Sequence, residues 1–154
     1  MKSSNMKTLA KLALLIIDFL VLDQVSKYFV KTSLSQPVNL LGDFFKFEYA
    51  ENTGIAFSLP VPYLVIIISN ILLIGFLIYL AVKELNLSSK IAQIAIALLI
   101  AGGVGNLIDR ILHGFVVDFI SIWKYPFFNL ADAYIITAVL LLVVFYGKIK
   151  RVKK

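Results

Sequence analysis

The sequence predicts an all-α membrane protein with four transmembrane helices and a small extramembrane β region on its outer face. Two observations lead to this prediction: 60% of the 154 residues are hydrophobic, and only 16% are charged. Soluble domains carry about 45–50% apolar and about 25% charged residues. A water-soluble fold of this size would leave too much apolar surface in contact with water. The same composition excludes a disordered chain.

Four apolar stretches have the length of membrane spans, since a helix needs about 20 mostly apolar residues to cross a bilayer. We place them, within a single polytopic domain over residues 1–154, at residues 9–28, 61–82, 91–108 and 127–146. The first stretch follows Lys2 and Lys7, as in a secretory signal peptide. Because it carries Asp18 and Asp23 and is too long for the apolar core of a signal peptide, we interpret it as a retained anchor.

The distribution of basic residues predicts that both termini lie in the cytoplasm. With this orientation, ten of the fifteen Lys and Arg residues lie inside, where Glu84 is the only acid. The outer segments, residues 32–60 and 112–126, and the adjoining span ends then carry a net charge of −2. The positive-inside rule favours this arrangement. Since basic tails suit an anionic inner leaflet, the net charge of +6 indicates membrane lipids as partners and not nucleic acid.

The two outer segments hold most of the unusual polar residues. Residues Phe45 to Tyr49 alternate apolar and polar side chains, which is typical of a strand, and Asn52-Thr53-Gly54 is typical of a turn. The second segment carries Trp123, Tyr125 and several phenylalanines, as expected at a membrane interface. Any chemistry is therefore expected at the outer membrane edge.

Ionisable residues within membrane segments are costly and indicate function. Asp23 and Lys27 are spaced i,i+4 with the acid first, which favours a helical ion pair. The alternative is a pair at the interface that lets the helix end reach the lipid headgroups. Asp18 lies near the middle of the first span on a different face, either protonated or paired across the bundle, and its role stays open.

A run of small residues leads into a second polar cluster: Gly102, Gly103, Gly105, Asn106, Asp109 and Arg110. Small residues let helix backbones approach closely in lipid. The three polar residues lie within one helical turn, and Arg110 is suited to bind a carboxylate or a phosphate as part of one network with Asp109. The alternative is a helix-end cluster that faces lipid headgroups. We interpret His113 as a polar residue at the start of a loop and not as a catalyst.

Asp118 and Asp132 are two further acids at the outer edge. Asp118 stands in an apolar run, where a carboxylate is costly unless it is paired or neutral. Asn129 and Asp132 have the spacing of a capping box, which gives Asp132 a structural explanation but leaves Asp118 without one. If the chain folds back, the two carboxyls share a site and one keeps its proton. Such a pair suits a base that activates water beside an acid, and which residue holds the proton stays open.

Other function classes depend on other residues. The chain has no Cys and one His, which excludes disulfides, a thiolate nucleophile, and metal sites built from Cys or several His. A Ser–Lys protease built on Ser26 and Lys27 is disfavoured, because neighbours on a helix point about 100° apart and Asp23 keeps Lys27 charged. A proton-conducting transporter that uses Asp18 and a non-enzymatic assembly subunit are the remaining alternatives.

Taken together, these motifs resemble those of bacterial lipoprotein signal peptidase (signal peptidase II). The similar strings, in the family's order, are Asp23–Lys27, Asn52–Phe57, Gly102–Arg110, Gly114–Phe119 and Phe128–Asp132. They cover nearly the whole chain, and their combination is highly specific. Ile55, where the family usually has a small residue, and the short segment between Asp118 and Asn129 depart from the family pattern.

The resemblance implies an aspartyl endopeptidase of the bacterial inner membrane with Asp118 and Asp132 as its catalytic dyad. Its substrates would be prolipoproteins that carry diacylglycerol, cleaved just before the lipidated Cys at the outer side of the membrane. The resemblance implies no cofactor and no metal, inhibition by cyclic peptides of the globomycin type, and we expect a monomer. By motif position, the residues that support the dyad or hold substrate are Asn52, Asn106, Arg110 and Asn129. The residues tied to structure or activity are Asp23, Lys27, Gly54 and Asp109.

Overall fold

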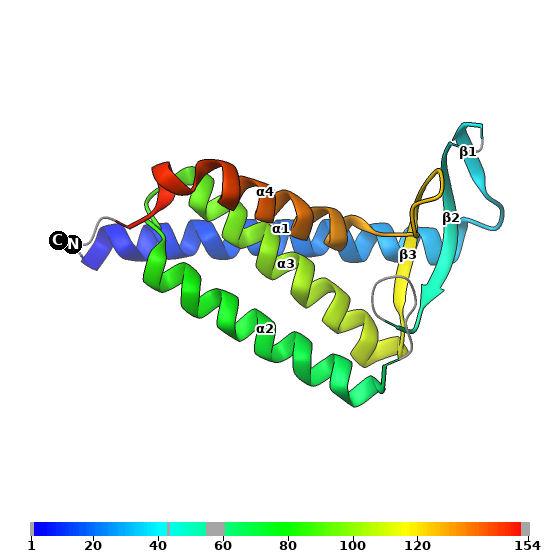
Figure 1. Cartoon of the computed structure of the whole chain (residues 1–154), viewed down its shortest axis with the longest axis horizontal. Helices are drawn as coiled ribbons and strands as arrows, with labels where there is room; N and C mark the ends of the chain where they lie inside the picture. Colours follow the sequence, from blue (N-terminus) through cyan, green and yellow to red (C-terminus); the bar gives the residue numbers. More distant parts are fainter. Residues whose placement is uncertain (1, 43, 55–60, 152–154) are drawn as a thin grey trace.

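The computed structural model describes residues 2–42, 44–54 and 61–151, with side chains from residue 6 onward. Its elements are α1 (Lys2–Ser33), β1 (Val38–Leu41), β2 (Phe45–Asn52), α2 (Tyr63–Glu84), α3 (Lys90–His113), β3 (Val116–Ile122) and α4 (Leu130–Ile149). The helices extend along the long axis, with the sheet at one end and the start of α1 and the end of α4 at the other (Figure 1). Ile55, Ala56 and Phe57 of one motif lie outside the described residues.

Each predicted span coincides with a helix, but the ends differ. α1 covers 32 residues, about 48 Å, against the predicted 9–28, because no Gly or Pro interrupts the chain before Pro37. α3 continues five residues past its predicted end and stops where Gly114 adopts a left-handed conformation (φ 82°). α4 begins three residues later than predicted, since Asn129 caps it.

Membrane character is clearest in three helices. Among the described residues, α2, α3 and α4 are each long and apolar enough to cross a membrane. α1 does not meet the same measure, and Asp18, Asp23 and Lys27 interrupt its apolar stretch. Length and composition therefore support three of the four predicted spans, and α1 is the exception. Large apolar side chains such as Leu72 on α2 and Val143 on α4 are more than 60% exposed, as expected for lipid-facing surfaces.

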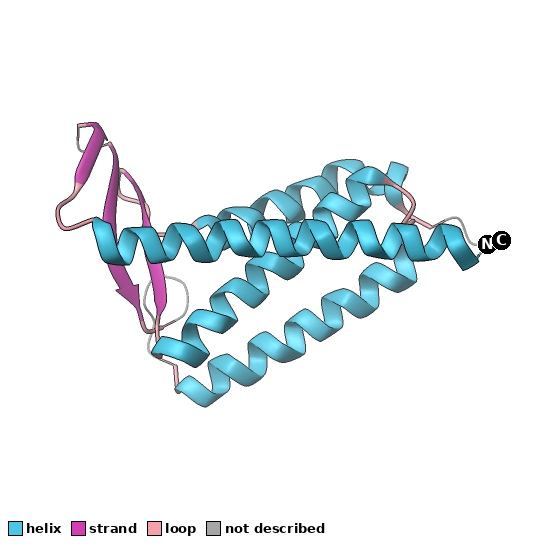
Figure 2. Ribbon diagram, turned by 180° about the vertical axis from the view of Figure 1, so that it is seen from behind, coloured by secondary structure: helices cyan, strands magenta, loops and turns pink. Residues whose placement is uncertain are grey.

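α3 is the central helix and contacts α1, α2 and α4. A Cβ on Gly102 would lie 2.5 Å from the carbonyl oxygen of Ala131 in α4, and one on Gly105 would lie 2.5 Å from Oδ2 of Asp23 in α1. No side chain fits at either position, so the glycines permit the close helix packing that was predicted from the sequence. α1 lies along the whole bundle and reaches the sheet (Figure 2).

The sheet is antiparallel, in the order β1-β2-β3. The predicted strand at Phe45–Tyr49 is confirmed and extends to Asn52, whereas β3 falls in a segment predicted only as an interfacial loop. β3 pairs with β2 so that Asp118 lies opposite Ala50, and Ile120 also bonds to Phe128. This pairing brings the end of β2, the middle of β3 and the start of α4 together.

Candidate active site

Asp118 lies in the middle of β3 with only 2% of its surface exposed. Its Oδ2 accepts a hydrogen bond from Nδ2 of Asn52 (3.0 Å), and its Oδ1 accepts one from Nδ2 of Asn129 (2.7 Å). Asn52 is itself oriented, because its Oδ1 accepts the backbone N–H of Gly54 (3.1 Å), an Asx turn. The predicted turn at residues 52–54 thus directs one amide donor at Asp118.

The protonation of Asp118 follows from this environment. Burial is the main reason that the pKa of Asp118 rises from 3.8 to about 6. The hydrogen bonds from Asn52 and Asn129 lower the pKa, while the negative charge of Asp132 raises it further. Asp118 therefore holds a proton in a pH range where an ordinary aspartate is ionised.

Asp132 is the third residue of α4 and forms the capping box expected from the sequence. Its N–H donates to Oδ1 of Asn129 (3.0 Å), and its Oδ2 accepts the N–H of Asn129 (3.3 Å). Its Oδ1 accepts a hydrogen bond from Nδ2 of Asn106 on α3 (2.8 Å). Both oxygens accept hydrogen bonds at the positive end of a helix, an arrangement that stabilises a charged carboxylate.

Asn129 connects the two acids. It is fully buried, and its Nδ2 donates both to Oδ1 of Asp118 (2.7 Å) and to Oδ1 of Asn106 (3.2 Å). Its side-chain oxygen accepts the N–H of Asp132. The chain therefore folds back between β3 and α4 and brings two acids that are 14 positions apart into one hydrogen-bonded network.

Lys27 is 3% exposed and extends this network into α1. Its Nζ lies 2.9 Å from Oδ2 of Asp23 and 3.1 Å from Oδ2 of Asp109, and it donates to Oδ1 of Asn106 (3.0 Å). The predicted i,i+4 pair with Asp23 is confirmed. The alternative of a helix end that reaches the headgroups is wrong, because Lys27 faces α3. Asp23 also accepts the N–H of Ala131 (2.9 Å), which ties α1 to the first turn of α4.

Asp109 and Arg110 point to different partners. Asp109 accepts hydrogen bonds from the N–H of Val117 (3.1 Å) and from Gln24, whereas Nη2 of Arg110 donates to the carbonyl oxygen of Gly54 (3.2 Å). The two neighbours nevertheless belong to one network, as expected, since Asp109 joins it through Lys27 and Arg110 joins it through Gly54 and Asn52. Through this bond to the backbone of Gly54, the Arg110 side chain fixes the Asx turn next to Asp118.

Gln24 lies within the Asp23–Lys27 motif but is not among the predicted site residues. Its Nε2 donates to Oδ2 of Asp23 (3.1 Å), Oδ1 of Asp109 (3.2 Å) and the carbonyl oxygen of Gly105 (3.3 Å). It therefore bridges the two acids that flank Lys27. A polar side chain next to Asp23 in an apolar stretch was the signal that could have identified it.

Asp18 and His113 lie apart from this network. Asp18 is exposed on α1 and lines a cavity with lysines at the end opposite the sheet. His113 is exposed at the end of α3, where its ring stacks on Phe115 with centroids 5.7 Å apart. Across residues 2–42, 44–54 and 61–151, there is no group of three His, Cys, Asp or Glu side chains that could hold a metal ion.

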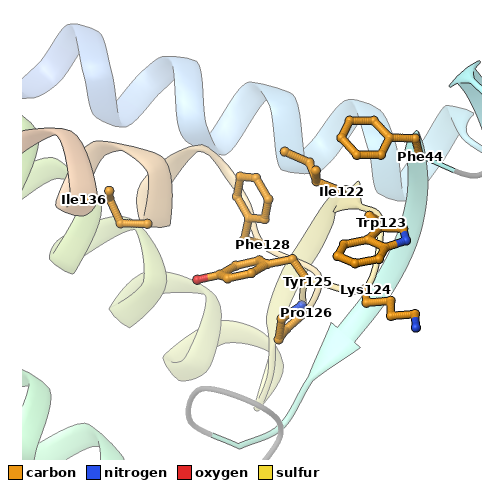
Figure 3. Close-up of a pocket in the computed structure, with 8 residues that line it drawn as sticks. All are labelled: Phe44, Ile122, Trp123, Lys124, Tyr125, Pro126, Phe128 and Ile136. Atoms are coloured by element: carbon orange, nitrogen blue, oxygen red, sulfur yellow. The ribbon is translucent and has the colours of Figure 1, made fainter.

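An apolar pocket of about 580 Å³ lies between the sheet and α4 (Figure 3). Phe128 directly precedes the helix cap, and Ile136 lies one turn after Asp132. Trp123 and Tyr125 form the exposed side of the pocket and have 67% and 57% of their surfaces exposed. The pocket combines aromatic and aliphatic walls, as needed to hold an apolar ligand group.

Comparison with known proteins gives a consistent result. A family model described as signal peptidase (SPase) II matches residues 15–147. The lipoprotein signal peptidase of Caldicellulosiruptor bescii is 43% identical over 131 residues, which is 84% of this chain and 85% of that protein. The corresponding protein of Moorella thermoacetica is 35% identical over 84% of this chain and 87% of its own length. A solved bacterial membrane enzyme has a TM-score of 0.81 at 30% identity, over 90% of this chain and 88% of that one. The chain belongs to the signal peptidase II family.

Proposed function

We propose that the protein is an aspartyl endopeptidase that removes signal peptides from prolipoproteins, with Asp118 and Asp132 as its catalytic pair. The observation that carries the proposal is the arrangement around Asn129, which bonds to Asp118 and Asp132 from one buried side chain. Two acids in one network, one buried in β3 and one at a helix N-terminus, are suited to differ in protonation. Membership of the signal peptidase II family supports the same assignment.

In the proposed mechanism, Asp132 is the ionised base and Asp118 the acid that holds the proton. Asp132 takes a proton from water, and the water oxygen attacks the scissile carbonyl carbon. Asp118 donates its proton to the carbonyl oxygen, which gives a tetrahedral gem-diol. The C–N bond then breaks, the proton on Asp132 passes to the leaving amine nitrogen, and a proton of the gem-diol returns to Asp118. No acyl-enzyme forms, and general acid–base catalysis of this kind contributes about 10²–10⁴-fold per group.

The surrounding residues would position this pair. Asn52 and Asn129 orient Asp118, and Asn106 orients Asp132. Lys27 pairs with both Asp23 and Asp109 and fixes Asn106 from the far side. These residues act through the carboxyls and not on the substrate, so we propose them as positioning residues. We propose Arg110 and Gly54 as the wall of the substrate site, because they fix the turn beside Asp118.

We propose that the substrate is a prolipoprotein with diacylglycerol on its Cys, cleaved just before that residue. A signal peptide is an apolar helix, and the exposed apolar faces of the bundle offer it a path through the lipid to the sheet end. The aromatic pocket beside α4 suits an apolar group of such a substrate. Cyclic peptides of the globomycin type would compete for the same site.

The proposed topology has four spans, both termini in the cytoplasm, and the dyad at the outer surface. The length of α1 supports its assignment as a membrane span, since about 48 Å exceeds the ~30 Å thickness of the hydrocarbon core. Two of its interrupting charges, Asp23 and Lys27, are buried and paired and therefore do not face lipid. Leu14, Val21 and Phe29 on the same helix are more than half exposed, as a lipid-facing surface requires.

The assay uses the purified protein and two forms of one prolipoprotein, with and without diacylglycerol on its Cys. Mass spectrometry of the products gives both the rate and the cleaved bond. We expect a single cut directly before the lipidated Cys, little or no cut in the unlipidated form, and an unchanged rate in EDTA. Cleavage at another bond, or equal cleavage of both forms, would contradict the proposed substrate. Loss of cleavage in EDTA would contradict the proposed mechanism.

A further inference from the structure

A cavity of about 670 Å³ opens between the first half of α1 and the start of α3, at the end of the bundle opposite the sheet. Four charged side chains line it: Lys7, Lys11, Asp18 and Lys90. The cavity is therefore positively charged, with three cations and one anion. It shares no lining residue with the candidate active site, and the proposed function assigns it no role.

The charges on α1 belong to one helix face. Lys7, Lys11 and Asp18 are spaced by four and seven residues, which places them in one row along the helix. Leu14 lies between Lys11 and Asp18 in the same row and also lines the cavity. Lys90 faces this row from the first turn of α3, a turn that holds no acidic residue.

The three lysines are available to a ligand. All three side chains are exposed. Among the described residues, ion pairs within 4.0 Å are formed by Lys27 and Lys46, and none by these three lysines. Three ammonium groups held around one cavity repel each other, and a bound anion relieves that repulsion. Lys is a common phosphate-binding residue in proteins.

We propose that this cavity binds the phosphate headgroup of an anionic phospholipid. We favour a lipid over a soluble phosphate because apolar side chains line the cavity on the membrane side of the lysines. Leu14 is 60% exposed and Ile94 is 38% exposed, and both line the cavity beside the charged groups. Acyl chains can lie along these side chains while the phosphate contacts the lysines. Basic pockets between membrane helices bind anionic lipid headgroups by this combination of contacts.

Asp18 limits how deep the phosphate enters. It lies seven residues after Lys11, about 10 Å further along α1. Its negative charge repels a phosphate that moves past the lysines into the apolar part of the cavity. Replacement by Asn raises the net charge of the lining by one, so Asp18→Asn should strengthen the binding of an anionic lipid.

The test uses the purified full chain in nanodiscs that contain equal amounts of phosphatidylglycerol and phosphatidylcholine. Native mass spectrometry after release counts the lipids that stay bound. We expect the wild type to retain phosphatidylglycerol preferentially. The triple variant Lys7→Gln, Lys11→Gln, Lys90→Gln should retain at least about tenfold less, since each basic residue near an anionic surface contributes about fivefold. Asp18→Asn should retain severalfold more than the wild type.

The matched control removes three other lysines near the ends of α2 and α4: Lys83→Gln, Lys148→Gln, Lys150→Gln. None of them lines the cavity. This control should keep the wild-type preference, and an equal loss in both triple variants would overturn the proposal in favour of general surface attraction. Displacement of the lipid by millimolar inorganic phosphate would overturn the choice of a lipid. If thermal unfolding shows that the triple variant is not folded, the single variants Asp18→Asn and Lys11→Gln replace it in the test. Weaker lipid binding by Asp18→Asn would then overturn the proposal.

Discussion

The Asn129 side chain makes three hydrogen bonds. Its oxygen caps α4, and its amide group donates to Asp118 and to Asn106. The cap stabilises the helix, and the two donated bonds set the orientation of the polar network. These two contributions can be separated, because a serine hydroxyl can also cap a helix but cannot donate two hydrogen bonds.

We predict that Asn129→Ser keeps the cap but loses the donated bonds to Asp118 and Asn106, which lowers kcat at least about 100-fold with KM little changed and costs about 1–3 kcal/mol of stability. Asn129→Ala should lose the same activity and in addition about 1 kcal/mol of stability, since the cap is lost. Cleavage kinetics and denaturant unfolding in detergent measure the two effects. Full activity in Asn129→Ser would show that the bridge between the two acids is not needed.

Asp118 should make stability depend on pH. Its pKa is about 6 in the folded protein against 3.8 for an ordinary aspartate, so the folded state binds more protons between these two values. The contribution of Asp118 to the free energy of unfolding should therefore be fully present below about pH 4 and fall as the pH rises through about 6, by up to about 3 kcal/mol.

Asp118→Asn provides the comparison for this effect. The variant places an amide against the donors of Asn52 and Asn129, which lowers stability at every pH. It cannot titrate, however, so the difference in unfolding free energy between wild type and variant should shrink from pH 4 to pH 7. A difference that stays constant or grows with pH would contradict the buried, raised-pKa carboxyl.

For single residues, the sequence indicates which side chains are unusual but not which groups they bond to. Asp118, Asp132 and Lys27 stand out because they are charged in an apolar background. That Asp109 bonds to Lys27 while its neighbour Arg110 bonds to Gly54 depends on how α3 is rotated against β2 and α1. The spacing of residues along the chain does not determine this rotation, so the bonding partners of Asp109 and Arg110 could not be predicted.

Among the elements, α3 sets the geometry of the network. Its glycines bring α1 and α4 so close that Lys27 can reach Asp109 on α3 and Asp23 can reach the first turn of α4. A Cβ at position 105 would press on Asp23, whose carboxylate is fixed by its ion pair and cannot move away. The small residues are therefore a condition for the polar contacts and not only for helix packing.

Gly105→Ala should destabilise the protein by about 1–3 kcal/mol, as overpacking does in a tight core. Gly75→Ala on α2 is the matched control, because nothing lies within 4 Å of its added Cβ. That change should be neutral or stabilise by up to about 1 kcal/mol, since Ala favours a helix more than Gly. Thermal unfolding of both variants measures the difference, and equal stability would contradict the close approach of α1 to α3.

The existence of an element, though not its exact ends, was predicted where the local signal is strong. The four apolar runs each became a helix, and the alternation at Phe45–Tyr49 became part of β2. β3 was missed, although residues 116–122 are rich in β-branched and aromatic residues, because an interfacial loop explained the same aromatics. The sheet is formed by strands far apart in the sequence, and this non-local pairing has no periodic signature.

At the scale of the whole molecule, the two ends differ in chemistry. The sheet end combines buried acids with an aromatic pocket, and the opposite end carries the lysine-lined cavity. In the proposed topology these ends face opposite sides of the membrane. The absence of Cys from the sequence makes this topology directly testable.

Single cysteines introduced at Ser35, between α1 and β1, and at Ser88, between α2 and α3, should report opposite sides of the membrane. We predict that a membrane-impermeant maleimide labels Ser35→Cys in intact spheroplasts and labels Ser88→Cys only after permeabilisation. Lys7→Cys at the start of α1 should behave like Ser88→Cys if α1 is the fourth span. Labelling of Lys7→Cys in intact spheroplasts would contradict that span.

In the proposed mechanism, Asp118 and Asp132 together perform the hydrolysis. Its most direct measurement is the single-turnover cleavage rate of a diacylglyceryl prolipoprotein by Asp118→Asn, Asp132→Asn and the control Asp18→Asn, each checked for folding. We predict a loss of at least about 10³-fold in both dyad variants and a rate within about threefold of wild type in the control. Cleavage at the wild-type rate by either folded dyad variant would contradict this mechanism.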